Sequence, residues 1–412
     1  MIRREIDSPY AWFRLTVSVL LSAIGGVGMW SVVVALPAVQ ADFHAERGAA
    51  SLPFTLTMIG FGIGGVIMGR LADRRGIILP VMIGAASLGA GFILASFSGG
   101  LLSFAAAYLL IGALGTAATF VPLMANISFW FEKRRGIAIA LCASGNYLSG
   151  AIWPTLIEAV IRTHGWRAAH LAIGGFCLVV MPPLATLLHS RPPVRAIGAP
   201  VPRASLHRIA LPPRVLQILL AVAGLACCVA MSMPQVHIVA YCGDLGYGAT
   251  SGAQMLSLML GFGIISRIGS GFLADWLGGL VTLLIGSFAQ MVALTLYLMM
   301  DGLTSLYVIS ALFGLFQGGL VPSYAIIVRE SFPAKEAGGR VGIILMMTLL
   351  GMALGGWMSG VIFDLTGSYR AAFANGVAWN GLNFLIALFL LFRSPLIAPR
   401  SATAGHAGSA AG

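Results

Sequence analysis

Long apolar runs follow one another along almost the whole chain. Twelve of them extend over roughly 20 residues or more, the length that an α-helix needs to cross about 30 Å of hydrocarbon. The runs are rich in glycine and lack the alternating ten-residue pattern of a membrane β-barrel. Transmembrane helices are therefore expected over residues 14–37, 51–69, 77–97, 102–129, 136–160, 169–188, 215–240, 252–273, 279–300, 304–328, 340–363 and 371–392.

The composition excludes a soluble globule. Hydrophobic residues make up 58% of the chain and charged residues only 9%, and the mean hydropathy is +0.94. Such a chain has too little polar surface to dissolve, so we expect it to lie in a lipid bilayer. The expected fold is an all-α membrane protein with twelve transmembrane helices in two six-helix bundles.

Basic residues are distributed unevenly between alternate loops. The net charge of +11 is compatible with nucleic-acid binding on its own. However, 19 of the 24 Lys and Arg residues fall in the termini and the even-numbered loops, and the exceptions are Arg47, Arg162, Arg167, Arg370 and Arg267. This asymmetry follows the positive-inside rule. It predicts a multi-pass protein of the plasma (cytoplasmic) membrane, the cell inner membrane, with both termini cytoplasmic and no nucleic-acid partner.

A polar segment divides the runs into two sets of six. Residues 189–213 are rich in proline and arginine and have no apolar face to bury, so they are expected to form a cytoplasmic linker. The expected domains are therefore an N-terminal six-helix bundle at 1–188 and a C-terminal six-helix bundle at 214–412. The second domain is expected to end in a short disordered tail.

The two sets of runs repeat one signature. GFGIGGVIMGRLADRRG begins at Gly60, GFGIISRIGSGFLADWLGG begins at Gly261, and both contain the block G-x-L-A-D-x-x-G. Other matches recur in the same order at offsets of 200 to 206. Two related six-helix halves are an architecture of transporters that rock two bundles about a central site. The residues assigned to a conformational motif at the ends of spans 2 and 8 are Gly69, Asp73, Arg74, Gly76, Gly271 and Asp275.

The same segments carry a family resemblance. GRLADRRG resembles the loop signature of the major facilitator superfamily between spans 2 and 3. Within that superfamily, ISFWFEKRRGIAIALCASG from Ile127, HGWRAAHLAIGG from His164, HIVAYCGDLGY from His237 and SRIGSGFLAD from Ser266 are similar to the monocarboxylate porter and oxalate/formate antiporter group. The resemblance extends over essentially the whole chain. It implies transport by alternating access.

One basic residue lies inside an apolar run. Arg267 is about six residues, or ~9 Å, from the expected end of span 8. An arginine near the bilayer middle costs ~2.5 to 3.5 kcal/mol on insertion scales, so it is normally paired or lines a wet cavity. All 13 acidic residues lie in loops or at span ends. Arg267 is therefore expected either to hold an anionic substrate through its guanidinium fork or to snorkel or bond backbone carbonyls.

The resemblance assigns a role to Arg267 and also shows departures. In the family, the arginine at this place in span 8 binds the substrate carboxylate. Animal monocarboxylate porters carry an acid one turn earlier, where this chain has Gly263, and a lysine in span 1, where it has none. Proton coupling through those family residues is thus not expected. Span 11 also lacks the lysine with which the oxalate exchanger holds a second carboxylate, which favours a monocarboxylate.

Other residues in the runs are candidates for the pocket wall. His237 is either a proton carrier or a histidine bonded to its neighbours. Phe120 stands where related bacterial proteins often have a tyrosine, which suggests a more apolar substrate face, although core packing explains it equally well. The polar candidates in spans 5 and 10 are Asn146, Tyr147, Gln317 and Tyr324.

These observations favour a secondary active transporter of a small organic monocarboxylate, a symporter or antiporter, with Arg267 holding the carboxylate. The alternative is an exporter of another small molecule, a drug or metabolite, in which Arg267 is structural. An intramembrane enzyme would need clustered His, Asp or Glu at mid-depth, and the runs contain no such cluster. No enzyme activity, cofactor or metal is therefore expected. The expected partners are the organic anion and the lipid bilayer, and the sequence leaves open whether a proton is transported as well. The protein is expected to function as a monomer.

Overall fold

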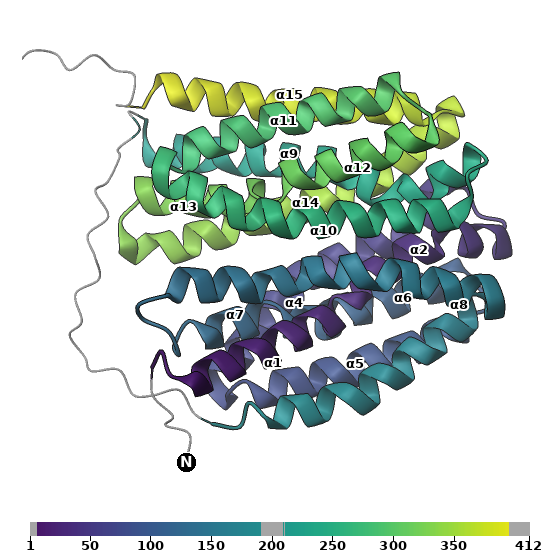
Figure 1. Cartoon of the computed structure of the whole chain (residues 1–412), viewed down its shortest axis with the longest axis horizontal. Coiled ribbons are helices and arrows are strands. Elements are labelled where there is room, and N and C mark those ends of the chain that lie inside the picture. The colour runs from purple at the N-terminus through teal and green to yellow at the C-terminus, as the bar shows by residue number, and fades with distance from the viewer. Residues whose placement is uncertain (1–5, 191–208, 210, 395–412) are drawn as a thin grey trace, which may run out of the picture.

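The computed structural model describes residues 6–190, 209 and 211–394, and all regular structure in them is helical. The helices run roughly parallel in two groups, with α1–α8 below and α9–α15 above in Figure 1. The first group comprises α1 Pro9–Gly25, α2 Val27–Asp42, α3 Arg47–Ala50, α4 Leu52–Arg75, α5 Ile78–Ser96, α6 Leu101–Leu110, α7 Val121–Ile127 and α8 Arg135–Thr186. The second comprises α9 Pro213–Asp244, α10 Gly248–Leu277, α11 Gly279–Met299, α12 Leu303–Gln317, α13 Leu320–Ser331, α14 Ala334–Thr366 and α15 Tyr369–Phe392.

The described helices provide twelve membrane crossings. When consecutive helices such as α1 and α2 are joined and α8 is counted once, eleven helical segments are long and apolar enough to be candidate spans. However, α8 has 52 residues, or ~78 Å at 1.5 Å per residue, more than twice the thickness of a hydrocarbon core. It is broken at Gly165, whose φ of 83° and ψ of 165° are not helical, so α8 forms the expected fifth and sixth spans.

Three of the expected spans are not continuous helices. The first is divided into α1 and α2 at Gly26, and the tenth into α12 and α13. The fourth is interrupted between α6 and α7 by a π-helical turn, Ile111–Gly115, and a 3₁₀ turn, Thr116–Thr119. The end of α1 packs directly on this irregular stretch, because a Cβ on Gly25 would lie only 2.0 Å from Thr119 Oγ1.

The internal repeat is visible in the backbone. Gly76 ends α4 with φ 82° and ψ 174°, and Gly278 ends α10 with φ 82° and ψ 163°. Both angles lie in a region that favours glycine because a Cβ is disfavoured there. The two copies of the signature thus end in the same conformation, 202 residues apart in the sequence.

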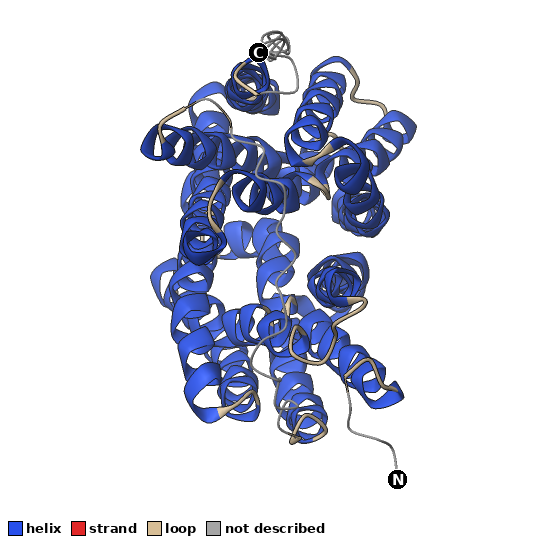
Figure 2. Ribbon diagram, turned by 90° about the vertical axis from the view of Figure 1, so that its left-hand side faces the viewer, coloured by secondary structure: helices blue, strands red, loops and turns tan. Residues whose placement is uncertain are grey.

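The two ends of the bundle are distinct. We call the end at which α1 begins and α15 ends the terminal end, and the opposite end, which carries α3, the Arg47 end (Figure 1). Figure 2 looks along most of the helices and separates the two groups again. Most of the expected linker at 189–213 and the expected disordered tail lie outside the described residues.

Candidate functional site

A cavity of about 320 Å³ lies between the two helix groups. Its wall is built by α2, α4, α7 and α8 of the first group and by α9, α10, α13 and α14 of the second. Among the described residues that line it, Arg267 is the one charged side chain, and the polar ones are Asn146, Tyr147, Gln235 and Thr348. The rest of the wall is apolar or glycine.

Arg267 lies deeper than the sequence suggested. Helix α10 continues to Leu277, ten residues beyond Arg267, which places its Cα ~15 Å from the helix end at 1.5 Å per residue. Nη1 donates to the carbonyl oxygen of Ala143 in α8 at 3.1 Å, and Nε is buried without a partner. In the described part of the chain, no carboxylate forms an ion pair with this guanidinium.

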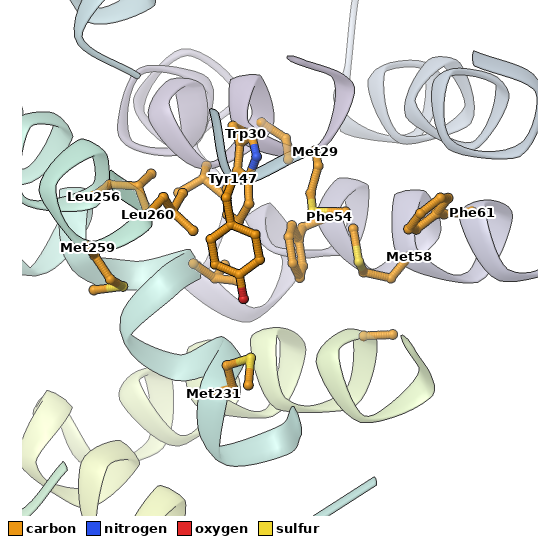
Figure 3. Packing of buried hydrophobic residues seen from close by; sticks show 14 of the residues in the cluster. Met29, Trp30, Phe54, Met58, Phe61, Tyr147, Met231, Leu256, Met259 and Leu260 are labelled. Atoms are coloured by element: carbon orange, nitrogen blue, oxygen red, sulfur yellow. The ribbon is translucent and has the colours of Figure 1, made fainter. Parts of the chain in front are cut away.

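The Tyr147 ring packs against this guanidinium. The Arg267 Cζ lies 4.6 Å from the centre of the Tyr147 ring, a cation–π geometry. A Cβ on Gly263 would lie 2.4 Å from Tyr147 Cε1, so the ring occupies the space that a larger residue at 263 needs. An acidic side chain at 263 would therefore collide with the Tyr147 ring that packs against Gly263. Figure 3 shows the Tyr147 side chain reaching from the first group toward Met231 of the second.

Two more of the predicted residues line the cavity. Phe120, at the start of α7, packs edge-on against Phe61 with ring centres 5.6 Å apart. Asn146 lines the wall with its amide nitrogen 3.9 Å from Met29 Sδ. The backbone carbonyl oxygen of Asn146 accepts a hydrogen bond from Trp30 Nε1 at 3.2 Å.

The structure does not place His237 in the cavity wall. It lies in α9, fully buried, with Nε2 2.8 Å from the carbonyl oxygen of Gly356 and Nδ1 3.0 Å from the Tyr369 hydroxyl. A carbonyl oxygen only accepts, so Nε2 donates, and in the neutral ring Nδ1 accepts from the tyrosine. Both ring nitrogens are therefore satisfied by neighbouring helices.

Gln317 and Tyr324 are also fully buried behind the wall. Gln317 Oε1 accepts from Nε2 of Gln235 at 2.8 Å, and the Tyr324 hydroxyl donates to Asn383 Oδ1 at 2.7 Å. Their side chains point into the second helix group because polar partners on α9 and α15 satisfy them there.

Sequence reasoning missed several wall residues. Gln235 and Thr348 line the cavity, and so do five of the chain's methionines. In α9, Cys228, Met231 and Gln235 follow one another at spacings of three and four, the periodicity of one helix face. That spacing was visible in the sequence, but it is the same for a face packed against another helix.

The Arg47 end is closed by contacts between the two groups. Arg47 of α3 holds both carboxylate oxygens of Asp244 at 2.7 and 3.2 Å, and its Nη1 also donates to the Tyr369 hydroxyl at 2.8 Å. Asp364 accepts from the backbone N–H groups of Arg47 and Gly48 at 2.8 and 2.6 Å. From the sequence alone, Arg47 is expected only to be a charged residue of an outer loop.

The motif residues lie at the terminal end, away from the cavity wall. Asp73 and Asp275 are exposed, and the start of α11 is capped by the carboxylate of Glu330, 3.2 Å from the backbone nitrogen of Gly279. Gly69, Arg74 and Gly271 belong to α4 and α10, and Gly76 caps α4.

Comparison with known proteins agrees with this architecture. The chain is 28% identical to monocarboxylate transporter 13 of Bos taurus over 85% of this chain and 82% of that protein. It is 26% identical to the uncharacterized MFS-type transporter YcxA of Bacillus subtilis (strain 168), over 84% and 86%. In fold it resembles a bacterial homologue of the human lysosomal transporter Spinster, in an inward-facing and occupied conformation, with a TM-score of 0.67, 15% identity, and coverage of 94% and 97%.

The family model of the Major Facilitator Superfamily matches residues 18–313 and 281–410. This match covers most of the chain, and it confirms the expected helical transporter fold. The expectation of a transporter rather than an enzyme is confirmed by the same match. The chain belongs to the Major Facilitator Superfamily.

Proposed function

We propose that this transporter carries a small organic monocarboxylate by alternating access and that Arg267 holds the carboxylate. The observation that carries the proposal is that Arg267 is the one charged side chain among the described residues of the cavity wall and has no ion-pair partner among them. A substrate carboxylate neutralises that charge through two parallel hydrogen bonds. The names of the monocarboxylate transporters 13 and 11, both about 28% identical to this chain, support the same substrate class.

One carboxylate fits this wall better than two. The part of α14 that lines the cavity, from Gly342 to Met352, contributes glycine, leucine, methionine and Thr348 and no basic residue. A second carboxylate would leave water without a cationic partner, which is costly in an apolar site. A monocarboxylate avoids that cost.

Phe120, Asn146 and Tyr147 act as wall residues in this proposal, because they line the cavity. His237, Gln317 and Tyr324 act from behind the wall by holding α9, α12, α13 and α15 together. His237 then has no direct path to the substrate, so a transported proton travels on the substrate. We further propose cytoplasmic termini in the plasma membrane, as the charge asymmetry predicts, and a functional monomer.

A second function has one observation in its favour. Arg267 already donates to Ala143 and lies over Tyr147, so its charge is partly accommodated by the protein. In that case Arg267 is a structural residue, and the chain exports another small molecule.

Counterflow in proteoliposomes separates the two functions. Labelled monocarboxylates and dicarboxylates are tested at pH 7.5, with and without a pH gradient, against protein-free liposomes as the background. We expect uptake of monocarboxylates by wild type and by Arg162→Ala, whose residue is exposed and outside the cavity wall. Arg267→Ala is expected to abolish it. Carboxylate uptake by Arg267→Ala at the wild-type rate would favour the second function.

A further inference from the structure

We propose that the substrate is an aryl monocarboxylate, in which an aromatic ring on a short chain occupies the part of the cavity away from Arg267. This inference rests on the proposed function and narrows it. It follows from three properties of the wall: its hydrogen-bonding capacity, its side chains and its size.

The wall offers few free hydrogen-bonding groups beyond Arg267. Thr348 Oγ1 donates to the carbonyl oxygen of Leu345 at 2.7 Å, and Gln235 Nε2 donates to Gln317. The side-chain oxygens of Asn146 and Gln235 have no hydrogen bond, but they are buried from the cavity space.

Tyr147 supplies the remaining group. In the described part of the structure its hydroxyl has no protein partner, and its ring lies beneath the Arg267 guanidinium. The polar groups of the wall thus gather at one place, where a carboxylate binds. A hydroxyl or amino group elsewhere on the substrate would lose its hydrogen bonds to water without replacement, which disfavours a polar skeleton.

The rest of the wall matches an aromatic ring. Aromatic side chains line it from α2, α4 and the start of α7, namely Trp30, Phe61 and Phe120. Five methionines line it as well: Met29, Met124, Met231, Met346 and Met352. Methionine sulfur makes favourable contacts with aromatic rings, and its flexible side chain adapts to rings of different shape. Figure 3 shows several of these side chains around Tyr147.

The size of the cavity agrees with a ring-bearing acid. A volume of about 320 Å³ corresponds to roughly ten water molecules at ~30 Å³ each. An acid of two or three carbons fills only part of this space and leaves apolar wall in contact with water. A phenyl or indole ring joined to a carboxylate covers that wall and reaches Arg267 at the same time.

Counterflow with two labelled probes tests the inference. Phenylacetate and lactate are each measured at pH 7.5 in liposomes with and without protein, and unlabelled indole-3-acetate, pyruvate and 3,4-dihydroxyphenylacetate serve as competitors. We expect phenylacetate and indole-3-acetate to bind at least about tenfold more tightly than lactate or pyruvate. The dihydroxylated ring is expected to compete less well than phenylacetate. The reverse order, with lactate transport that depends on Arg267, would overturn the inference and leave the proposed function intact.

Variants locate the ring in the cavity. Phe120→Ala should weaken phenylacetate binding about tenfold, the equivalent of ~1.4 kcal/mol, by removing one aromatic contact, while lactate changes less than twofold. Phe272→Ala is the matched control, because Phe272 lies in α10 with 69% of its surface exposed, outside the cavity wall. Equal losses for phenylacetate and lactate in Phe120→Ala would contradict the placement of the ring. If neither probe shows uptake that depends on Arg267, the proposed function fails and the inference fails with it.

Discussion

At the scale of single residues, the site is organised around the contact between Arg267 and Tyr147. The described residues of the cavity wall include no Asp or Glu beside them. The face of the Tyr147 ring attracts the Arg267 charge and so supplies part of the stabilisation that a counter-ion would give. Gly263 makes this arrangement possible, because only glycine has no Cβ and therefore leaves room for the ring. A departure from the family pattern at 263 is thereby connected to a physical contact.

Replacing Gly263 tests this contact. The added methyl group in Gly263→Ala would lie 2.4 Å from the Tyr147 ring, so the ring must move by about 1 Å to reach an ordinary separation near 3.5 Å. We expect carboxylate affinity to fall about tenfold, measured by competition in counterflow. The matched control is Gly261→Ala in the same helix, where the nearest atom is Ala151 Cβ at 3.9 Å and no change is expected. Equal affinity in both variants would show that the position of the ring does not matter.

At the scale of helices, polar residues inside the spans serve two purposes that the sequence does not separate. Arg267 was predictable as a central cation because it lacks a partner in its own run, whereas Gln317, Tyr324 and His237 were assigned to the wall on polarity alone. Each of these three finds its partner on another helix, and that pairing depends on how the helices are rotated. The breaks at Gly26 and between α6 and α7 were likewise not predictable, since they follow from close packing of one stretch against another.

The Gln235–Gln317 pair gives an element-scale prediction. Gln317→Leu leaves the amide of Gln235 without its buried acceptor, so the detergent-solubilised protein should melt a few degrees lower. Gln235→Leu with Gln317→Leu should recover at least part of that loss, because removing both partners is cheaper than orphaning one. Thermal unfolding of the three proteins checks this. A double variant no more stable than Gln317→Leu would contradict the argument.

At the scale of the whole molecule, the two helix groups meet through different contacts at their two ends. The cavity is lined by one face of α4 between Phe61 and Val66 and one face of α14 between Gly342 and Met352. It lies on the terminal side of the contacts around Arg47. Alternating access requires those contacts to break, because they join α3 of the first group to α9, α14 and α15 of the second. We therefore expect Arg47 to act as a gate residue.

Arg47→Gln should shift the protein toward a conformation open at the Arg47 end, because it removes the bidentate bond to Asp244. A cysteine at Thr55, which is bonded to the carbonyl oxygen of Ala353 across the two groups, reports the opening in a background without other cysteines. Its reaction with a membrane-impermeant thiol reagent should accelerate at least about threefold, as expected for the loss of ~0.7 kcal/mol or more of closing free energy. Arg162→Gln is the control for charge. An unchanged rate in Arg47→Gln would exclude Arg47 as a gate.

The central claim is that Arg267 recognises the charge of a carboxylate, and equilibrium binding tests it most directly. Purified wild type and Arg267→Ala are titrated with phenylacetate and with its primary amide, which keeps the shape but not the charge. The account predicts that wild type binds the acid about a hundredfold more tightly than the amide, the equivalent of ~2.7 kcal/mol for a bidentate charged contact, and that Arg267→Ala loses this difference. The account would be contradicted if Arg267→Ala bound the acid as tightly as wild type does. It would also be contradicted if wild type bound the amide as tightly as the acid.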